Sequence, residues 1–407
     1  MKILFYNHTA KVSGAERVLL LILSLLDARE FRAVVMCPAG ELQTLVEGQN
    51  VPCVVTENLV ARFTYHPALL WQYLRSFARV IRTVRAQVKA AAPDVIHANS
   101  IRAGLVMTFA TLGLSVPVVW HLHDLLPHHP ISTAIRCCVS LSARVRLLAV
   151  SQATENRFRG WLLRPFRQRV PSTVLRNCAD TERFQPDETS RQRIRTELGL
   201  PATAFVIGII GQITARKGQL GLLNAFAKVQ ERIPTAVLLI VGEPLFTAAD
   251  QEYWQLLQQQ TQTLGLAAKV HLLGARRDVP AVMQTLDLLV VNSLEEPCGL
   301  VVLEGMASAI PVLATRVGGT PEMIQHGSHG WLVSSQREDE LATAIGQLQT
   351  DPTLRARLAD AARERVSTQF SIASYQQAVV QFYREMQPQS CTGRQRQPQA
   401  ITEGSER

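Results

Sequence analysis

The chain has 407 residues, more than one hydrophobic core usually sustains, so two domains are the default expectation. Hydrophobic residues make up 47% of the chain and charged residues 18%, which excludes a largely disordered polypeptide. The apolar run from Val18 to Leu26 is too short to span a bilayer, and the first residues lack a signal-peptide core. We therefore expect a globular, cytoplasmic protein.

The formal charge of +9 comes from the first part of the chain. Residues 1–183 contain 22 Lys and Arg against 11 Asp and Glu, whereas residues 184–407 contain 20 against 22. The seven Cys residues form no CxxC pair and show no metal-type spacing. They are expected to be reduced thiols, and no metal ligand is predicted.

Short apolar runs rich in Val and Ile alternate with segments of helical period in the first part of the chain. A helix is predicted over residues 16–26, and strands are predicted at residues 3–6, 33–37, 51–55, 94–98, 116–120 and 147–150. This alternation predicts a parallel sheet, and hence a doubly wound domain over residues 1–183.

A second series of apolar runs follows a charged segment near residue 190. Its strands are predicted at residues 206–210, 237–241, 270–273, 288–291, 312–314 and 330–333. They indicate a second doubly wound domain over residues 184–370. Helical period continues to Met386, and the Gln-rich residues 388–407 are predicted to be disordered.

The segment Glu295–Ala307 follows a predicted buried strand and contains the acids Glu296 and Glu304. Pro297 and Gly299 suit a first helical turn, whose free N–H groups would face an anion such as a diphosphate. A spacing of eight residues, about two helical turns, would place both carboxylates along one side of a ligand, where they could accept hydrogen bonds from sugar hydroxyls. The alternative is a solvated acid pair that caps a helix.

Two glycine turns flank this segment in the sequence. The first, Gly208–Gly218, ends a predicted strand and carries the adjacent cations Arg216 and Lys217, which can neutralise a leaving diphosphate. Glycine turns of this kind also serve packing alone. The second, Arg316–Glu322, has a Pro at a predicted helix start and by itself indicates only a turn.

Two features of the first domain are candidates for a site. Ser13 is a candidate helix cap, and Gly14 would allow close approach of the backbone to a phosphate. His123 and Asp124 follow a predicted strand, so they are expected at its carboxyl end, facing a cleft between the domains. A packed histidine is the alternative interpretation of His123.

Taken together, these segments resemble glycosyltransferase family 4 over nearly the whole chain, and four motifs in the family's order carry the resemblance: Gly14-Ala15-Glu16-Arg17, His123-Asp124, Gly211 to Gly218, and Glu296 to Glu304 with the trailing Val317 to Glu322. The resemblance implies an α/β fold of the GT-B type, in which two doubly wound Rossmann-like domains face one another across a cleft. Residues 1–183 would form the acceptor side, residues 184–370 the nucleotide-sugar side, and residues 371–387 a helix that returns to the first domain.

The resemblance also implies an activity, namely retaining, metal-independent transfer of a sugar from a UDP- or GDP-sugar to a hydroxyl of a glycan or lipid-linked acceptor, with no cofactor. Glu304 would bind the ribose, Glu296 the hydroxyls of the donor sugar, and Lys217 the diphosphate. His123 would lie beside the reacting centre, which makes His123, Lys217 and Glu296 the expected catalytic residues. The implied donor site comprises Gly14, Gly211, Gln212, Arg216, Lys217, Arg277, Val279, Glu296, Cys298, Gly299, Leu300 and Glu304, with Ser13 and Asp124 on the acceptor side.

The chain departs from the family pattern at five positions. Gln212 replaces a usual Arg, which is expected to weaken phosphate binding, although Arg216 and Lys217 remain. Ser13, Cys178 and Ala309 each replace a usual Gly, and Cys298 replaces a usual Phe. A sugar-nucleotide 2-epimerase and a non-catalytic sugar-nucleotide-binding protein of the same fold therefore stay open as alternatives.

Basic residues recur at helical spacing in the first domain, opposite an apolar side that includes Trp71 and Leu74; they are Arg75, Arg79, Arg82, Arg85 and Lys89. A second basic cluster around Trp161 comprises Arg157, Arg159, Arg164, Arg167 and Arg169. An anionic membrane surface at the inner leaflet is the expected partner, and an ordinary solvated helix face is the alternative. Nucleic acid is not an expected partner, because the aromatic residues are not interleaved as stacking platforms.

Overall fold

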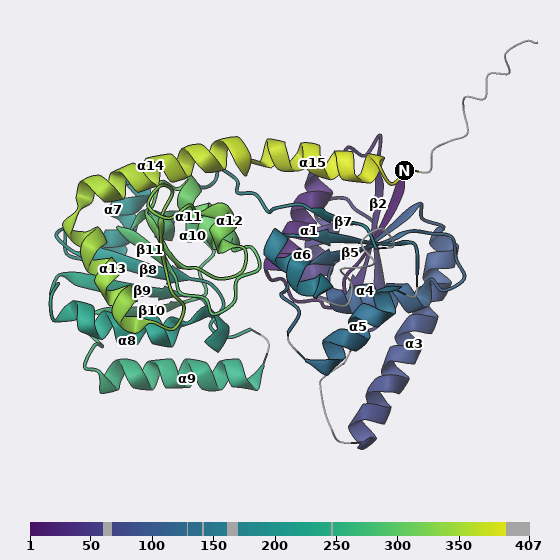
Figure 1. Ribbon diagram of the computed structural model, residues 1–407, viewed down its shortest axis with the longest axis horizontal. Helices are drawn as coiled ribbons and strands as arrows, with labels where there is room; N and C mark the ends of the chain where they lie inside the picture. The colour runs from purple at the N-terminus through teal and green to yellow at the C-terminus, as the bar shows by residue number, and fades with distance from the viewer. Residues whose placement is uncertain (60–66, 128, 141, 161–169, 246, 388–407) are drawn as a thin grey trace, which may run out of the picture.

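The computed structural model describes residues 1–387 apart from residues 60–66, 128, 141, 161–169 and 246, and it leaves out residues 388–407 (Figure 1). The tail that was predicted to be disordered therefore lies outside the described residues. Two lobes are visible, each with a parallel sheet between helices, and a long pair of helices runs along both (Figure 1). The predicted α/β architecture is confirmed.

The first lobe is built on a parallel seven-stranded sheet in the order β3-β2-β1-β4-β5-β6-β7. Its strands are β1 (Lys2–Tyr6), β2 (Arg32–Pro38), β3 (Cys53–Thr56), β4 (Val95–Ala98), β5 (Val118–Leu122), β6 (Val145–Ala149) and β7 (Ser172–Val174). Its helices are α1 (Gly14–Leu25), α2 (Glu41–Glu47), α3 (Pro67–Ala91), α4 (Ile101–Ala110), α5 (Pro130–Ser140) and α6 (Gln152–Arg159). The strand order reverses between β1 and β4, and ligands of doubly wound sheets bind at such a reversal.

The second lobe is built on a parallel six-stranded sheet in the order β10-β9-β8-β11-β12-β13. Its strands are β8 (Phe205–Ile210), β9 (Ala236–Val241), β10 (Val270–Gly274), β11 (Leu288–Val291), β12 (Val312–Thr315) and β13 (Trp331–Val333). Its helices are α7 (Glu188–Glu197), the 3-10 turn η2 (Ala215–Lys217), α8 (Gln219–Gln230), α9 (Ala248–Thr263), α10 (Val279–Gln284), α11 (Leu300–Ala307), α12 (Thr320–Met323), α13 (Glu338–Thr350) and α14 (Pro352–Gln369). Here the order reverses between β8 and β11.

The last helix, α15 (Ile372–Arg384), returns to the first lobe, as the family resemblance implied (Figure 1). Tyr375, Val379 and Phe382 are buried in the hydrophobic cluster that contains Ile3 and Phe5 of β1. At the crossing, the Ala179 N–H donates to the Phe370 carbonyl at 3.0 Å, so the two connections between the lobes run side by side. The apolar stripe of α15 thus completes the core of the lobe that contains the start of the chain.

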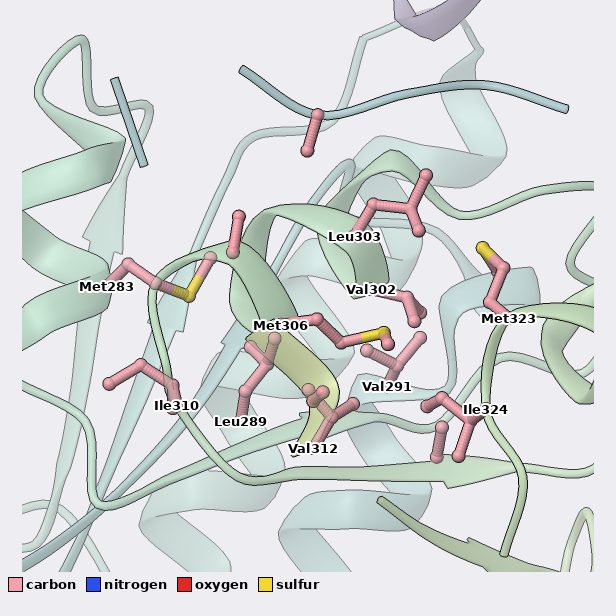
Figure 2. Packing of buried hydrophobic residues seen from close by; sticks show 14 of the residues in the cluster. Met283, Leu289, Val291, Val302, Leu303, Met306, Ile310, Val312, Met323 and Ile324 are labelled. Carbon is pink, nitrogen blue, oxygen red and sulfur yellow. The ribbon is translucent and has the colours of Figure 1, made fainter. Parts of the chain in front are cut away.

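Helix α11 sits directly on its sheet because its inner face is apolar and small. Figure 2 shows Val302 and Met306 of this helix over Leu289 and Val312 of β11 and β12. A β-carbon on Gly305 would lie 2.3 Å from Leu289 Cδ2, so no larger residue permits this approach. The contact fixes the height of α11 above the sheet and with it the position of Glu304.

Two details of the architecture lay beyond the sequence patterns. Strand β7 was not predicted, because an edge strand of three residues leaves no apolar run. Pro297 and Gly299 were expected inside a helical turn, but α11 begins only at Leu300, with Gly299 as its N-cap. Over the described part of the chain, no helix is both long and apolar enough to cross a membrane.

Candidate functional site

The carboxyl ends of the two sheets face each other. A β-carbon on Gly14, which opens α1, would lie 3.9 Å from Leu300 Cδ1 at the start of α11. On the same side, Lys11 Nζ donates to the Leu245 carbonyl at 2.6 Å. The first residues of α1 and α11 therefore adjoin, and the free N–H groups and positive dipole ends of both helices favour an anion between the lobes.

Glu296 lies in the loop between β11 and α11 and is only 3% exposed. Its Oε2 accepts from Lys217 Nζ at 2.5 Å and from Ser293 Oγ at 2.8 Å. A buried carboxylate without partners would be costly, and this ammonium group and this hydroxyl supply the partners. The structure thus joins two of the predicted catalytic residues, which are 79 positions apart in the chain.

Lys217 reaches Glu296 because two loops interlock at the strand reversal of the second sheet. The Leu294 N–H donates to the Arg216 carbonyl, and Asn292 Nδ2 donates to the Gly218 carbonyl, both at 2.8 Å. Gly218 has φ +70°, and a β-carbon there would lie 2.1 Å from the Asn292 carbonyl oxygen. Glycine is required because only it allows this approach in a left-handed conformation.

Gly211 and Gln212 lie at the mouth of the same reversal. Gly211 has φ +150°, and no atom lies within 4 Å of a β-carbon built on it, so its outer side is open. The Gln212 carbonyl accepts from Gln219 Nε2 at 2.8 Å, which ties the strand end to α8. Both residues precede the turn that carries Lys217.

The trailing glycine turn turns out to support Glu296. The Gly319 N–H donates to the Glu296 carbonyl at 2.8 Å. Gly318 has φ +53°, and a β-carbon there would lie 2.0 Å from the same carbonyl oxygen. The sequence had indicated only a turn, whereas the structure places it against the backbone of the buried acid.

Glu304 lies on α11 and is partly buried, and its carboxylate forms no hydrogen bond or ion pair with any residue that the structure describes. Burial raises the pKa of its carboxyl, and the charges of Arg17 and Arg183 oppose that rise. The expectation that Glu296 and Glu304 share one helix is wrong, because Glu296 precedes the helix by four residues. Each acid has its own neighbours, so they are suited to different parts of a ligand.

Cys298 and the segment around Val279 are the remaining predicted donor residues of the second lobe. The Cys298 side chain is buried, burial raises the pKa of its thiol to about 12, and its Sγ contacts Met323 Sδ at 3.9 Å. Only its main chain could therefore meet a ligand. Val279 opens α10 beside the exposed Arg277, which lines a cavity of about 580 Å³ together with Arg183.

The predicted residues of the first lobe take different positions. His123 is partly buried at the end of β5, its Nε2 lies 3.1 Å from Asn99 Oδ1, and burial lowers its pKa to about 3. Ser13 caps α1, and both its N–H and its Oγ donate to the Glu16 carboxylate. Asp124 is exposed.

Several residues of this region escaped the sequence analysis. Ser293 contacts Glu296, Asn99 contacts His123, and the charge of Arg183 influences Glu304. The one available signal was position, because Asn99 directly follows a predicted buried strand of one sheet and Ser293 lies two residues after a predicted buried strand of the other. In the part of the chain that the structure describes, no group of three His, Cys, Asp or Glu side chains is arranged as a metal site.

The two predicted basic clusters have different outcomes. The cluster on α3 is partly exposed, and most of the cluster around Trp161 lies outside the described residues. In α3, Arg75, Arg79 and Arg82 are exposed, as are Trp71 and Leu74. Arg159 does not belong to a basic surface, because it is 2% exposed and paired with Glu155. Arg157 binds Glu295 of the second lobe at 3.1 Å, and residues 161–169 lie outside the described ranges.

Both lobes match known sequence families. Residues 190–365 match the family described as Glycosyl transferases group 1, and residues 12–183 match Glycosyltransferase Family 4. The first match contains Lys217, Glu296 and Glu304, and the second contains Gly14 and His123.

Individual proteins agree with these families. The D-inositol 3-phosphate glycosyltransferase of Corynebacterium jeikeium is 33% identical over 223 residues, which are 54% of this chain and 53% of that relative, so the match spans about half its length. The protein of the same name from Corynebacterium aurimucosum is 30% identical over 298 residues, 69% of each chain. Anabaena HepE, solved in complex with UDP and glucose, is 30% identical with a TM-score of 0.78, covering 94% of this chain and 99% of that chain. HepE was also solved with UDP-glucose. The chain therefore belongs to glycosyltransferase family 4 and has the two-domain GT-B fold.

Proposed function

We propose that this chain is a retaining, metal-independent glycosyltransferase that moves a sugar from a UDP-sugar to a hydroxyl of a glycan or lipid-linked acceptor. The observation that carries the proposal is the buried contact between Lys217 and Glu296, at the strand reversal of the second sheet. It places a cation and a hydrogen-bond acceptor together beside two adjoining helix N-termini.

In this proposal the second lobe binds the donor. Lys217 and Arg216 approach the diphosphate, and the first N–H groups of α11 offer further donors to its oxygens. The negative charge on the diphosphate grows as it leaves, so fixed donors and cations stabilise the transition state more than the ground state. The Glu296 carboxylate accepts hydrogen bonds from the sugar, and Glu304 accepts them from the ribose.

The transfer proceeds on one face of the sugar. The bond between the anomeric carbon and the diphosphate oxygen breaks, and the acceptor oxygen forms its bond from the same side. The proton of the acceptor hydroxyl passes to an oxygen of the departing diphosphate. We expect the configuration of the anomeric carbon to be retained, which proton NMR of the product tests, and turnover to survive EDTA.

The HepE complexes with UDP and UDP-glucose support a UDP-sugar as the donor. Titration calorimetry with UDP-glucose and GDP-mannose tests this choice. We expect heat of binding with the first donor. If only the GDP-sugar binds, the proposed mechanism stands, but the donor carries guanine and not uracil.

The strongest test of the activity is Lys217→Ala. Removing the cation leaves Glu296 buried without its ion pair and the diphosphate without its closest positive side chain, so we expect the rate of transfer to fall at least 100-fold, about 2.7 kcal/mol. Lys228→Ala is the matched control, because Lys228 pairs with the exposed Asp339 on the surface. Equal rates in the two variants would defeat the assignment.

Two alternatives predict different products from the same assay. A 2-epimerase would convert the UDP-sugar without any acceptor. A binding protein would retain the donor unchanged when acceptors are supplied. Chromatography of the nucleotide fraction, with and without acceptor, separates both from transfer.

Helix α3 supports a lipid-linked acceptor at an anionic membrane surface. Trp71 is 58% exposed and Leu74 is 52% exposed, and the Arg75 guanidinium lies 5.0 Å from the Trp71 ring centre. Exposed apolar side chains next to Arg suit the headgroup region of an anionic bilayer. Sedimentation with phosphatidylglycerol vesicles is expected to carry the chain down, and Trp71→Ser/Leu74→Ser is expected to remain in solution. Equal sedimentation of both would remove α3 from the proposal.

A further inference from the structure

A chain of buried amides connects the start of α1 with His123. It runs from the Glu16 carboxylate through Asn7 and Asn99 to the His123 ring. Asn7 and Asn99 follow β1 and β4, the two strands between which the sheet order reverses, and both are 0% exposed. Buried polar groups of this kind keep one orientation, because every alternative leaves a donor or an acceptor without a partner.

The orientation of the first amide is set by two acceptors. Asn7 Nδ2 lies 2.8 Å from the Thr9 carbonyl oxygen and 3.2 Å from Glu16 Oε1. Both partners only accept, so the nitrogen of the amide must face them. The Asn7 oxygen therefore points toward Asn99.

The second amide inherits its orientation from the first. Asn99 Nδ2 lies 3.1 Å from Asn7 Oδ1 and 3.2 Å from the Ala15 carbonyl oxygen. A flipped Asn99 would place its oxygen against two other oxygens. Asn99 Oδ1 is consequently the atom that faces His123 Nε2, at 3.1 Å, and an amide oxygen can only accept.

We propose that Asn99 is a positioning residue that holds His123 in the tautomer protonated on Nε2, so that the Nδ1 lone pair accepts a hydrogen bond from a hydroxyl of the donor sugar. The first half of this inference concerns the free protein, and the second half rests on the proposed function. Nδ1 forms no hydrogen bond within the described residues, which leaves it available. His123 then accepts a hydrogen bond from the sugar and does not donate a proton to it.

The surroundings keep the imidazole neutral. Burial lowers the pKa of His123 and also the pKa values of His97 on β4 and His121 on β5, whose ring centre lies 3.9 Å from that of His123. Tyr383 of α15 closes the cluster with a hydrogen bond of 2.7 Å to His97 Nδ1. Along this series of hydrogen bonds, the first charged group is the Glu16 carboxylate, which is separated from His123 by the amides of Asn99 and Asn7.

Nitrogen NMR of histidine-labelled protein without ligand tests the tautomer directly. We expect the His123 signals, assigned by their loss in His123→Gln, to show a protonated Nε2 and an unprotonated Nδ1 throughout about pH 5 to 8. A protonated Nδ1, an averaged signal, or titration within that range would overturn the inference. This spectrum needs only the wild-type chain, so it decides the matter even where an Asn99 variant does not fold.

Asn99→Asp tests the positioning role. One carboxylate oxygen still accepts from Nε2 and stabilises the imidazolium, so in the folded variant His123 is expected to titrate near neutral pH and to present Nδ1 as a donor below that point. The other oxygen faces Asn7 Oδ1 and the Ala15 carbonyl, which is expected to lower the stability of the variant, so its fold is checked first by circular dichroism. Calorimetry at pH 6 is then expected to show roughly tenfold weaker binding of UDP-glucose with unchanged binding of UDP. Asn50→Asp, an exposed change of the same kind, is expected to alter neither the spectrum nor the affinity.

The two measurements separate the two proposals. If the wild-type chain does not bind UDP-glucose, the proposed function is contradicted. The tautomer of His123 is still decided by the nitrogen NMR spectrum of the free protein. An unchanged His123 spectrum in folded Asn99→Asp would contradict the positioning role, whatever sugar is transferred.

Discussion

Ala309 occupies a backbone conformation that residues with a side chain adopt at a cost. Its φ is +54°, in the left-handed region, directly after the C-cap of α11. The Ile310 N–H donates to the Gly305 carbonyl at 3.0 Å, which is the bond that closes a helix at such a position. The resemblance leads us to expect Gly here, which adopts this φ without strain.

Replacing Ala309 with Gly is therefore expected to stabilise the protein. The change removes a backbone strain of about 1–2 kcal/mol. Glycine loses more conformational entropy on folding than Ala, so the net gain in the free energy of unfolding is expected to be about 0.5–1 kcal/mol. Denaturant unfolding measures the gain. Ala78→Gly, in the exposed middle of α3, is expected to cost a similar amount, and a loss at both positions would contradict the argument.

Glu304 links the proposed site to pH-dependent stability. Its folded pKa is raised by burial, so the folded state favours the protonated carboxyl. The stability that this group contributes is fully present below its ordinary pKa of 4.5 and is lost as pH rises through the folded pKa. At higher pH a carboxyl at this position therefore leaves the free protein less stable than a neutral side chain would.

Glu304→Gln is neutral at every pH, so it is expected to melt at a higher temperature than the wild type at pH 7. The difference should vanish as pH falls toward 4, while donor binding is lost throughout because the amide cannot replace both carboxylate acceptors. Thermal unfolding across this range measures the effect. The exposed Glu182→Gln controls for the loss of one negative charge, and a pH-independent difference would contradict the role of burial.

At the scale of elements, the site depends on loops that pack backbone against backbone. The turn at Gly318 and Gly319 supports Glu296, and Gly218 joins the Lys217 turn to Asn292. Because these contacts involve carbonyl oxygens rather than flexible side chains, the loops have little room to adjust. The geometry of Lys217 and Glu296 is consequently a property of two interlocked strand ends.

Gly318→Ala is expected to displace the Glu296 loop. The added methyl group would lie 2.0 Å from the Glu296 carbonyl oxygen, so one of the two loops must move. This movement is expected to cost about 1–3 kcal/mol of stability in addition to backbone strain. Calorimetry with UDP-glucose is expected to show weaker binding. Gly327→Ala shares the positive φ, but its β-carbon meets no atom within 4 Å, so equal effects at both positions would count against the support of Glu296.

At the scale of the whole molecule, Glu322 joins the two lobes. Its carboxylate accepts from the N–H groups of Gln152 at 3.0 Å and Ala153 at 2.9 Å, at the start of α6, and from Arg176 Nε at 3.0 Å. The acid belongs to the second lobe and caps a helix of the first. This contact favours the arrangement in which α1 and α11 adjoin.

Glu322→Ala is expected to loosen that arrangement. Two N–H groups of α6 lose their acceptor, which costs about 1–2 kcal/mol of the contact between the lobes. Small-angle X-ray scattering of the free protein should show a larger radius of gyration than in the wild type. Arg176→Ala removes only a partly exposed ion pair and is expected to change the radius little, and equal radii in all three proteins would refute this role.

The sequence by itself determined the two parallel sheets, and the family resemblance of its motifs added the returning helix and the segments that face the other lobe. Buried strands of a parallel sheet are nearly continuous runs of Val, Ile and Leu, so they are legible without tertiary information. The motifs Gly14 to Arg17, Gly211 to Gly218 and Glu296 to Glu304 are each ambiguous alone, and it was their order along the chain that indicated a site.

Only the tertiary structure decided which side chains act on one another. Glu296 was predicted on a helix with Glu304 but lies in a loop, bound to Lys217, because the Gly318 turn and Asn292 fix that loop from other strands. Arg159 was predicted on a basic surface but is buried with Glu155. Asn99, which orients His123, carries no motif at all. Such contacts join residues that are far apart in the chain. Which group donates to which, and which groups are buried, is decided only when the sheets have formed.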